Sequence, residues 1–557
     1  YMRWWLVSRL QAFSGLGIFG GTPLAPLIWR LMGAKVGRHC LLQCSPPGAW
    51  DLVSIGDDSS IGFDTQLPGI RIEDGYLLVG SVSIGKRCFV GCHSYLGLNV
   101  TLEDDAKLDD QSLLPDEETI PAGESYRGAP AERGTVVVGD GAPLRQSNTY
   151  LSLFCAFQIL SVVLLGLALG IPAMLFGFSM AFAIVHTPAW VWMPLVAVAV
   201  PVIIVFLCCY LAWCKNAIYP APKPGTYELY SFAYLQFWLT MVILRVVRAA
   251  GWIIFTTIYL PPWMRLFGAR LGKHAEMSTV WSLFPDLLDI GDGVFLADGC
   301  CLNVSRFHLG RYVLKANCIG NRSFIGNSAL LPPGSKIGEE CLIGVLSVPP
   351  DPTQPTPDRT DWLGSPAFQL PNRQKVGGFD ERTTYAPTPK LYFQRGVIDA
   401  LRILIPAYLG LFLGTTTFII VLGLYNLLGV WAVYAAAPVL FWTALAVAVG
   451  TVVTIKWAVM GTFKPVIVPL WGRYVWLNEM IAGIYETVMA PVVSLFHGTP
   501  LAAPILRLIG CKIGKHCFIG SDLFSEFDLV EIGDYVAIND VSIVQTHLFE
   551  DRIMKSS

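Results

Sequence analysis

The chain has 557 residues, of which 54% are hydrophobic and 14% are charged, and its formal net charge is −2. Soluble globular proteins usually carry about 25% charged residues, so this composition is typical of a protein with membrane-spanning segments. A net charge so close to zero gives no electrostatic basis for binding nucleic acid. The composition therefore excludes the nucleic-acid-binding class and directs attention to the apolar segments.

The first predicted elements are an amphipathic helix over residues 1–20 and a repetitive coil over residues 21–134. The helix mixes aromatic, aliphatic and arginine side chains, as helices that lie in a membrane interface do. The coil has aliphatic residues every six positions, for example at Ile84, Val90 and Leu96, often followed by glycine. Neither an α-helix nor a simple alternating strand keeps that period. It is the hexapeptide pattern of a parallel β-helix, in which each aliphatic side chain points inward.

Two stretches further along the chain contain no Asp, Glu, Lys or Arg, from residue 146 to 214 and from residue 403 to 455. A membrane-spanning helix needs about 20 apolar residues, so each stretch is long enough for two. We predict transmembrane hairpins over residues 146–214 and 395–460. Buried helices of a large soluble core are the alternative, and the length and charge depletion of the stretches disfavour it.

Basic residues flank both charge-free stretches, including Arg145, Lys215, Arg402 and Lys456. Positively charged flanks remain in the cytoplasm during insertion. We therefore expect a bacterial cytoplasmic (inner) membrane protein whose coils lie on the cytoplasmic face.

The module of helix and coil recurs twice. Interfacial helices are predicted over residues 226–259 and 466–497, and coils over residues 260–373 and 498–557. The element "IGD" marks the same place in each copy, at Ile55, Ile290 and Ile532. The third coil is shorter than the others, and we expect both ends of the chain to be cut short.

Metal binding is not expected. The 14 cysteines are scattered, and the His-Cys pairs at His39 and His516 lack a neighbouring CxxC of zinc-site spacing. The second copy has His274 followed by alanine instead. Because His39, His274 and His516 occupy the same rung of each coil, we interpret them as structural turn residues.

Three motifs carry a family resemblance: the repeated "G(T)PL…LGxxIGxHC", the element "FDLVxIGD", and the final "QTHLFEDRxMK". They resemble the C-terminal membrane region of ε-poly-lysine-synthetase-like nonribosomal peptide synthetases. The resemblance implies three left-handed parallel β-helix domains in tandem, acyltransferase-like, alternating with transmembrane α-helical hairpins and interfacial helices. It also implies that the coils together imitate an acyltransferase trimer as a pseudo-trimer; a homodimer of chains stays open.

The same resemblance implies a reaction and its partners. A carrier domain outside this segment would present an aminoacyl thioester on its 4′-phosphopantetheine. An adenylation domain, also outside the segment, would use ATP to activate the amino acid. The region itself would join the thioester to a free amine, in contact with membrane lipids and without a metal.

A polar cluster near the end of the chain distinguishes the third copy from the others. Aligned through "IGD", His547 corresponds to Ile70 in the first copy and to Ser305 in the second. Glu526 corresponds to Ala49 and Phe284 in the same order, and Asn539 corresponds to Gly62 and Ala297. Residues shared by all copies are best explained by the coil. Polar residues of one copy are candidates for chemistry.

The candidate catalytic residues are His547, Glu526, Glu550 and Asp551, and the candidate substrate-binding residues are Asn539 and Asp540. Aminolysis of a thioester requires a neutral amine, whereas an alkylammonium has a pKa near 10. Histidine suits the role of general base, and a carboxylate would fix its tautomer; Glu526, Glu550 and Asp551 all remain open for this. Asn539 is a candidate donor to the oxyanion, and an acidic group would hold a lysine-like acceptor.

Other interpretations of the same residues remain. His547 is alternatively a polar loop residue, and Arg552 and Lys555 are expected to be solvated or lipid-facing. For the whole chain, one alternative is a coenzyme A-dependent membrane acyltransferase. Another is a non-catalytic scaffold or a channel for product export. The charge-free stretches 146–214 and 403–455 contain no Asp, Glu, Lys or Arg of the kind that lines such channels, and His186 lies at a turn.

Overall fold

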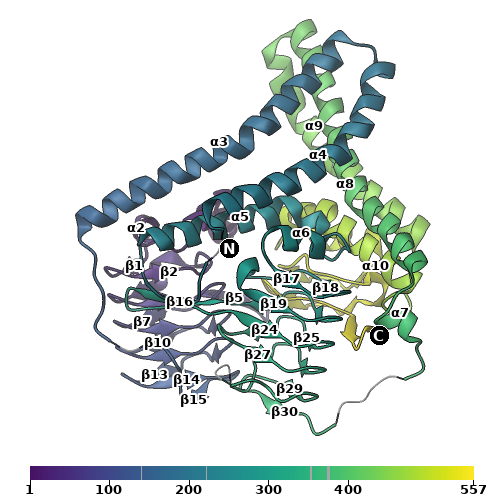
Figure 1. Cartoon of the computed structure of the whole chain (residues 1–557). Helices are drawn as coiled ribbons and strands as arrows, with labels where there is room; N and C mark the ends of the chain where they lie inside the picture. Colours follow the sequence, from purple (N-terminus) through teal and green to yellow (C-terminus); the bar gives the residue numbers. More distant parts are fainter. Residues whose placement is uncertain (140, 221, 352–353, 373–376) are drawn as a thin grey trace. The chain divides into compact units, whose positions relative to one another are not determined.

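The computed structural model describes residues 1–557 except 140, 221, 352–353 and 373–376 (Figure 1). The chain forms two compact units. The first consists of residues 1–71, 78–249 and 261–373, and the second of residues 72–77, 250–260 and 374–557.

The first unit opens with helices and a parallel coil. Its helices are α1 (Met2–Phe13), η1 (Leu16–Phe19), α2 (Leu24–Leu31) and η2 (Trp50–Leu52). The strands in this part of the chain are β1 (Lys35–Val36), β2 (Leu41–Leu42), β3 (Val53–Ile55), β4 (Ser60–Ile61), β5 (Ile70–Glu73), β6 (Tyr76–Val79), β7 (Val82–Ile84), β8 (Phe89–Val90), β9 (Tyr95–Leu96), β10 (Val100–Leu102), β11 (Lys107–Leu108), β12 (Leu113–Leu114), β13 (Thr119–Ile120), β14 (Ser125–Arg127) and β15 (Glu132–Arg133).

The six-residue period becomes a parallel β-helix. Strands β1, β3, β7, β10 and β13 pair in parallel along one ladder, and their last residues lie in register, so that Ile55, Ile84, Leu102 and Ile120 stack. These four side chains are buried in one hydrophobic cluster. Burying each such side chain contributes roughly 1.5–3 kcal/mol relative to leaving it exposed. Figure 1 shows the rungs succeeding one another from β1 to β13, with α2 beside the first of them.

The first unit continues through a helical hairpin into a second parallel coil. The helices in this part of the chain are α3 (Asn148–His186), α4 (Ala189–Ile218), α5 (Phe232–Gly251), η3 (Trp252–Ile254), which belongs to the second unit, α6 (Leu260–Leu266) and η4 (Pro285–Leu287). Its strands are β16 (Gly225–Glu228), β17 (Arg270–Leu271), β18 (Glu276–Met277), β19 (Leu288–Ile290), β20 (Phe295–Leu296), β21 (Cys301–Leu302), β22 (Ser305–His308), β23 (Arg311–Leu314), β24 (Asn317–Ile319), β25 (Phe324–Ile325), β26 (Leu330–Leu331), β27 (Lys336–Ile337), β28 (Leu342–Ile343), β29 (Asp361–Leu363) and β30 (Phe368–Gln369). Parallel ladders β17-β19-β24-β27 and β18-β20-β25-β28-β29 form the coil.

From α8 onward, the second unit has the order of elements found from α3 onward in the first: a helical hairpin, an edge strand, helices and a parallel coil. Its helices are α7 (Glu381–Thr384), α8 (Pro389–Leu428), α9 (Val430–Val459), α10 (Arg473–Ile484), the π-helical turn η5 (Tyr485–Met489), α11 (Ala490–Leu495), α12 (Ala502–Ile509) and η6 (Phe527–Leu529). Its strands are β31 (Val466–Pro469), β32 (Lys512–Ile513), β33 (Phe518–Ile519), β34 (Glu531–Ile532), β35 (Ala537–Ile538), β36 (His547–Glu550) and β37 (Ile553–Ser556). Parallel pairs β32-β34 and β33-β35 continue the hexapeptide geometry here.

The charge-free stretches form long helices. Among the described residues, five helices are long and apolar enough to cross a membrane: Asn148–His186, Trp190–Ile218, Phe232–Ala249, Glu381–Leu428 and Val430–Val459. The chain turns between α3 and α4 at Thr187 and Pro188, and between α8 and α9 at Gly429, whose φ is 81°. Helix α5, in the range predicted as interfacial, buries Phe237, Trp238 and Val242 among its apolar residues.

A lysine at the end of each hairpin is anchored in the coil that follows. Lys215 of α4 pairs with Asp286, and Lys456 of α9 lies 2.7 Å from Asp528. Both lysine side chains are fully buried. Asp286 and Asp528 lie in the segment just before "IGD" in their copies. The need to pair with a buried lysine explains why this aspartate recurs in the sequence. A buried charge requires such a partner, because desolvation without one is very costly.

The three histidines at equivalent rungs adopt one backbone conformation. His39, His274 and His516 have φ of 56°, 52° and 57°. A non-glycine residue with positive φ marks a tight turn. Their shared geometry fits the structural role predicted for them.

Candidate active site

The candidate site lies on a β-hairpin that follows the last coil. Strands β36 and β37 pair antiparallel, and β31 pairs with the other edge of β37. Asp551 and Arg552 form the two-residue turn, with φ of 48° and 66°. Positive φ at both positions is typical of type I′ hairpin turns. Asp551 therefore has a turn-forming role in the hairpin.

The same hairpin occurs in the other copies, which makes the site positions comparable. Strands β22 and β23 form it in the second copy, with β16 at the edge, and β5 and β6 form it in the first. His547 opens strand β36, as Ser305 opens β22 and Ile70 opens β5. The alignment through "IGD" thus corresponds to equivalent places in space.

Of the three candidate carboxylates, Glu526 contacts His547. The Nδ1 atom of His547 lies 2.8 Å from Oε1 and 2.9 Å from Oε2 of Glu526. Both side chains are largely buried, with 11% of the His547 side chain and 1% of the Glu526 side chain exposed. An ionised carboxylate only accepts hydrogen bonds, so Nδ1–H donates to Glu526 and Nε2 is the basic nitrogen. The Nε2 atom lies 3.0 Å from the amide nitrogen of Gln545, which donates to it in this tautomer.

Further hydrogen bonds hold the carboxylate in place. Asn478 of α10 donates to Oε1 of Glu526 at 2.7 Å, and the hydroxyl of Thr546 donates to Oε2 at 2.8 Å. Burial acts to raise the pKa of Glu526, but the hydrogen bonds and the charge of His547 outweigh it, and the pKa lies below its ordinary value. The carboxylate is therefore held in its ionised form beside the imidazole.

The backbone at Glu526 is unusual. Its φ of 36° and ψ of 59° lie in the left-handed region, whereas Ala49 and Phe284 at the same position in the other copies are extended, with φ of −129° and −124°. A non-glycine residue in such a conformation costs about 1–3 kcal/mol, and such residues cluster at functional sites. The strain occurs in the copy where the side chain contacts a histidine.

The second copy fills the corresponding space with aromatic rings. Phe237 follows the first residue of β16 by as many positions as Asn478 follows the first residue of β31, so the two residues occupy equivalent places. Phe237 and Phe284 stack with centroids 5.3 Å apart and planes within 5°. The hydrogen bond between Asn478 and Glu526 is thus replaced by an aromatic stack, and Ser305 replaces the histidine. This copy has no titratable pair at the equivalent place.

The structure gives the remaining candidates other surroundings. Glu550 forms an ion pair with Lys555 on the paired strand, at 2.5 Å. Asn539 accepts from the backbone N–H of Ile72 at 2.9 Å and donates to its carbonyl at 2.8 Å. Asp540 is exposed beyond β35. None of these contacts joins them to His547, so substrate-binding roles for Asn539 and Asp540 stay predictions.

Buried charges beside the site were missed by sequence reasoning. Arg395 and Asp399 of α8 and Glu479 of α10 form a cluster, with Arg395 3.4 Å from Glu479 and 3.7 Å from Asp399. Arg552, expected to be solvated or lipid-facing, is buried, and its guanidinium lies 5.6 Å from the ring centre of Tyr385. The expectation for Arg552 was wrong because the hairpin turn faces the protein interior.

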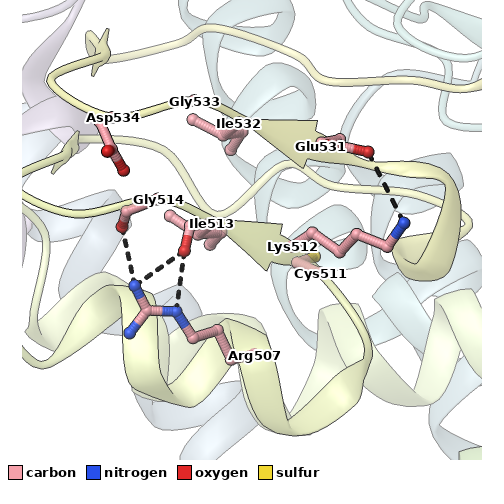
Figure 2. A pocket seen from close by; sticks show the side chains of 9 residues that line it. All are labelled: Arg507, Cys511, Lys512, Ile513, Gly514, Glu531, Ile532, Gly533 and Asp534. Carbon is pink, nitrogen blue, oxygen red and sulfur yellow. Dashed lines mark hydrogen bonds and ion pairs between the residues drawn. The ribbon is translucent and has the colours of Figure 1, made fainter.

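A surface hollow in the third coil has a structural explanation (Figure 2). Arg507 lines it and donates to the carbonyls of Ile513 and Gly514, at 2.8 Å and 2.7 Å from Nη2. Arg30 and Arg265 make the same contacts in the other copies. Since all three copies share the arrangement, it belongs to the coil and offers no specific chemistry.

Within the described part of the chain, no group of three or more His, Cys, Asp or Glu side chains is arranged to hold a metal ion. The described cysteines are all free. The contacts of the site place an oriented imidazole beside a carboxylate, an arrangement that accepts a proton and returns it.

Comparisons with known proteins first define a class. Residues 81–109 match the family described as "Hexapeptide repeat of succinyl-transferase". This match and the parallel ladders identify a hexapeptide-repeat parallel β-helix.

One curated protein is similar to the chain along its whole length. The chain is 30% identical over 577 aligned positions, across its whole length, to the delta-poly-L-ornithine synthetase of Acinetobacter baumannii (strain AB307-0294). It spans 43% of the length of that relative. The predicted resemblance to poly-amino-acid synthetases with hexapeptide repeats is confirmed.

Among solved structures, a maltose O-acetyltransferase from Clostridium difficile 630 is 22% identical and covers 20% of this chain and 62% of its own, with a TM-score of 0.17. A likeness at that TM-score supports no inference about this chain.

Proposed function

We propose that this chain is the membrane-bound, amide-forming region of a larger synthetase. It would join a carrier-bound aminoacyl thioester to the free amine of a basic amino acid, with His547 as general base. The observation that carries the proposal is the buried pair of His547 and Glu526, which the third copy alone possesses. The similarity to a delta-poly-L-ornithine synthetase supports an amide product and an amine acceptor.

The reaction is an aminolysis that needs no enzyme nucleophile. The acceptor nitrogen attacks the thioester carbonyl while Nε2 of His547 removes its proton. The tetrahedral intermediate then collapses, the carbon–sulfur bond breaks, and the imidazolium returns the proton to the leaving thiolate. Amide and thiol are the products, and no oxidant, reductant or metal is consumed.

Glu526 supports each proton transfer. It keeps Nδ1 protonated, which leaves Nε2 free to act as a base, and it stabilises the imidazolium that forms. Asn478 and Thr546 hold the carboxylate in position for that task. In the resting site, Gln545 occupies the position of the acceptor N–H at Nε2, and the amine would displace it.

The first two copies would support the third. The aromatic stack of Phe237 and Phe284 suits a packing role, and we propose that the coils act together as a pseudo-trimer. The hairpins would span the cytoplasmic membrane, with the coils on the cytoplasmic face. Activation of the amino acid with ATP, and its loading onto the 4′-phosphopantetheine of a carrier, would take place in domains outside this segment.

The test is the turnover of His547→Ala in the complete synthetase, with carrier loading assayed separately. Loading should be unchanged, and amide formation should fall by about 10²–10⁴-fold, the usual contribution of a general base. His516→Ala, a turn histidine of the same coil, is the matched control and should keep wild-type rates. Normal amide formation by His547→Ala would refute the proposal. Amide formation from a coenzyme A thioester, supplied in place of the loaded carrier, would favour the coenzyme A-dependent alternative.

A further inference from the structure

One exposed leucine occurs at the same place in each copy of the module. Leu31, Leu266 and Leu508 lie at or near the end of the short helices α2, α6 and α12, and 79%, 51% and 55% of their surfaces are exposed. A single exposed leucine is ordinary. Three at equivalent positions, in helices that bury Trp29, Met264 and Leu506, indicate a shared surface with a partner.

The surroundings of two of these leucines connect them to the apolar helices. The carbonyl of Leu266 accepts a hydrogen bond from Asn216 of α4, at 2.9 Å. The carbonyl of Leu508 accepts one from Trp457 of α9, at 3.1 Å. Both donors lie near the C-terminal ends of helices long and apolar enough to cross a membrane. The leucines therefore lie at the level where those helices meet the coils.

Exposed tryptophans lie at the same level. Trp213 of α4 is 64% exposed, and Trp457 of α9 is 44% exposed. Tryptophan is enriched where transmembrane helices leave the hydrocarbon, because its ring is apolar and its N–H is polar. This places a membrane interface beside Leu266 and Leu508.

Packing against a helical hairpin does not cover these leucines. In the second and third copies the hairpin is present, yet Leu266 and Leu508 remain about half exposed. In the first copy, Leu31 is joined by exposed residues of α1 at a spacing of four, namely Met2, Leu6 and Leu10. Residues four apart share one face of a helix, so α1 and α2 both present exposed apolar side chains.

We propose that Leu31, Leu266 and Leu508 insert into the acyl-chain region of a lipid bilayer. Each coil would then be held against the membrane by its own short helix, in addition to any spanning hairpin. The partner is a lipid surface, recognised by apolar contact and not by a specific headgroup. The inference rests on the hairpins spanning the membrane and is independent of the chemistry at His547.

The experiment uses the complete protein in lipid nanodiscs, with a photoreactive diazirine analogue of leucine placed singly at positions 31, 266 and 508. Matched controls carry the same residue at Tyr535 and Tyr76, which are exposed on a coil turn and on a hairpin. After illumination, mass spectrometry identifies the adducts. Amide formation is measured in parallel to show that each protein is folded.

Lipid adducts at positions 31, 266 and 508, with only background at the two controls, are the expected result. Lipid adducts at control level at all three leucines would overturn the proposal. Protein cross-links in place of lipid adducts would also overturn it and would identify a protein-covered face. Because the readout is not activity, failure here leaves the proposed reaction untouched.

Discussion

Replacing Glu526 by glutamine tests whether the carboxylate acts on the imidazole. The substitution keeps the size of the side chain and removes its charge. An opposite charge at hydrogen-bonding distance shifts an ionisation by about 1–3 pH units, and each unit is 1.36 kcal/mol. An imidazolium forming 2.8 Å from Glu526 should therefore lose about 1.4–4 kcal/mol of stabilisation in Glu526→Gln. Amide formation should slow by about 10–10³-fold.

The assay is single-turnover transfer from a loaded carrier to a free amine, repeated over a range of pH. The acid limb of the rate profile should move to lower pH in Glu526→Gln, because the imidazolium gives up its proton more readily without its ionic partner. Glu550→Gln is the matched control, since Glu550 pairs with Lys555 on the same hairpin, and it should behave as wild type. A wild-type rate in Glu526→Gln, or an acid limb moved to higher pH, would refute the reasoning.

Three further predictions concern the support of the site. Asn478→Ala removes a hydrogen bond to a charged group, worth about 1.5–3 kcal/mol, and should reduce turnover by about 10–100-fold without changing carrier loading; unchanged turnover would contradict this. Lys456→Met leaves the carboxylate of Asp528 buried without its partner and should destabilise the folded state by about 3–5 kcal/mol in thermal unfolding, whereas Lys512→Met, in an exposed pair, should leave the melting temperature unchanged. The pKa of Glu526 is lowered on folding, so the folded state binds fewer protons at this carboxyl. The contribution of Glu526 to stability is therefore present above pH 4.5 and lost as the pH falls below that value. Acid unfolding of Glu526→Gln should lack this component.

The sequence predicts the coil well because the period of six has one structural meaning. Each aliphatic position must face the interior for the rungs to stack, as Ile84 and Leu102 do in register. Helical hairpins follow as directly from the absence of charge. The spacing of "IGD" also predicts equivalent places in the three copies, so His547 and Glu526 stand out as polar residues of one copy.

The choice among carboxylates depends on three-dimensional geometry. Glu550 lies three residues after His547, and side chains alternate between the faces of a strand, so the two point to opposite sides of β36. Glu526 is 21 positions away in the sequence but faces the imidazole across the turn that precedes η6. No local spacing rule connects these two residues.

Asn478 could not be found from the coil alignment. It lies on α10, which precedes the coil. In this part of the module, an alignment from the edge strands differs by one residue from the alignment through "IGD". Counting from the edge strands would pair it with Phe237. The replacement of an aromatic residue by asparagine is the signal that this register would have revealed.

Amide formation is proposed to take place at the third copy. The most direct test compares the three equivalent positions, through Ile70→Ala, Ser305→Ala and His547→Ala, in single-turnover aminoacyl transfer from a loaded carrier. His547→Ala should lose transfer by about 10²-fold or more, while the other two variants should retain it. Retained transfer in His547→Ala, or an equal loss in Ser305→Ala, would contradict the account.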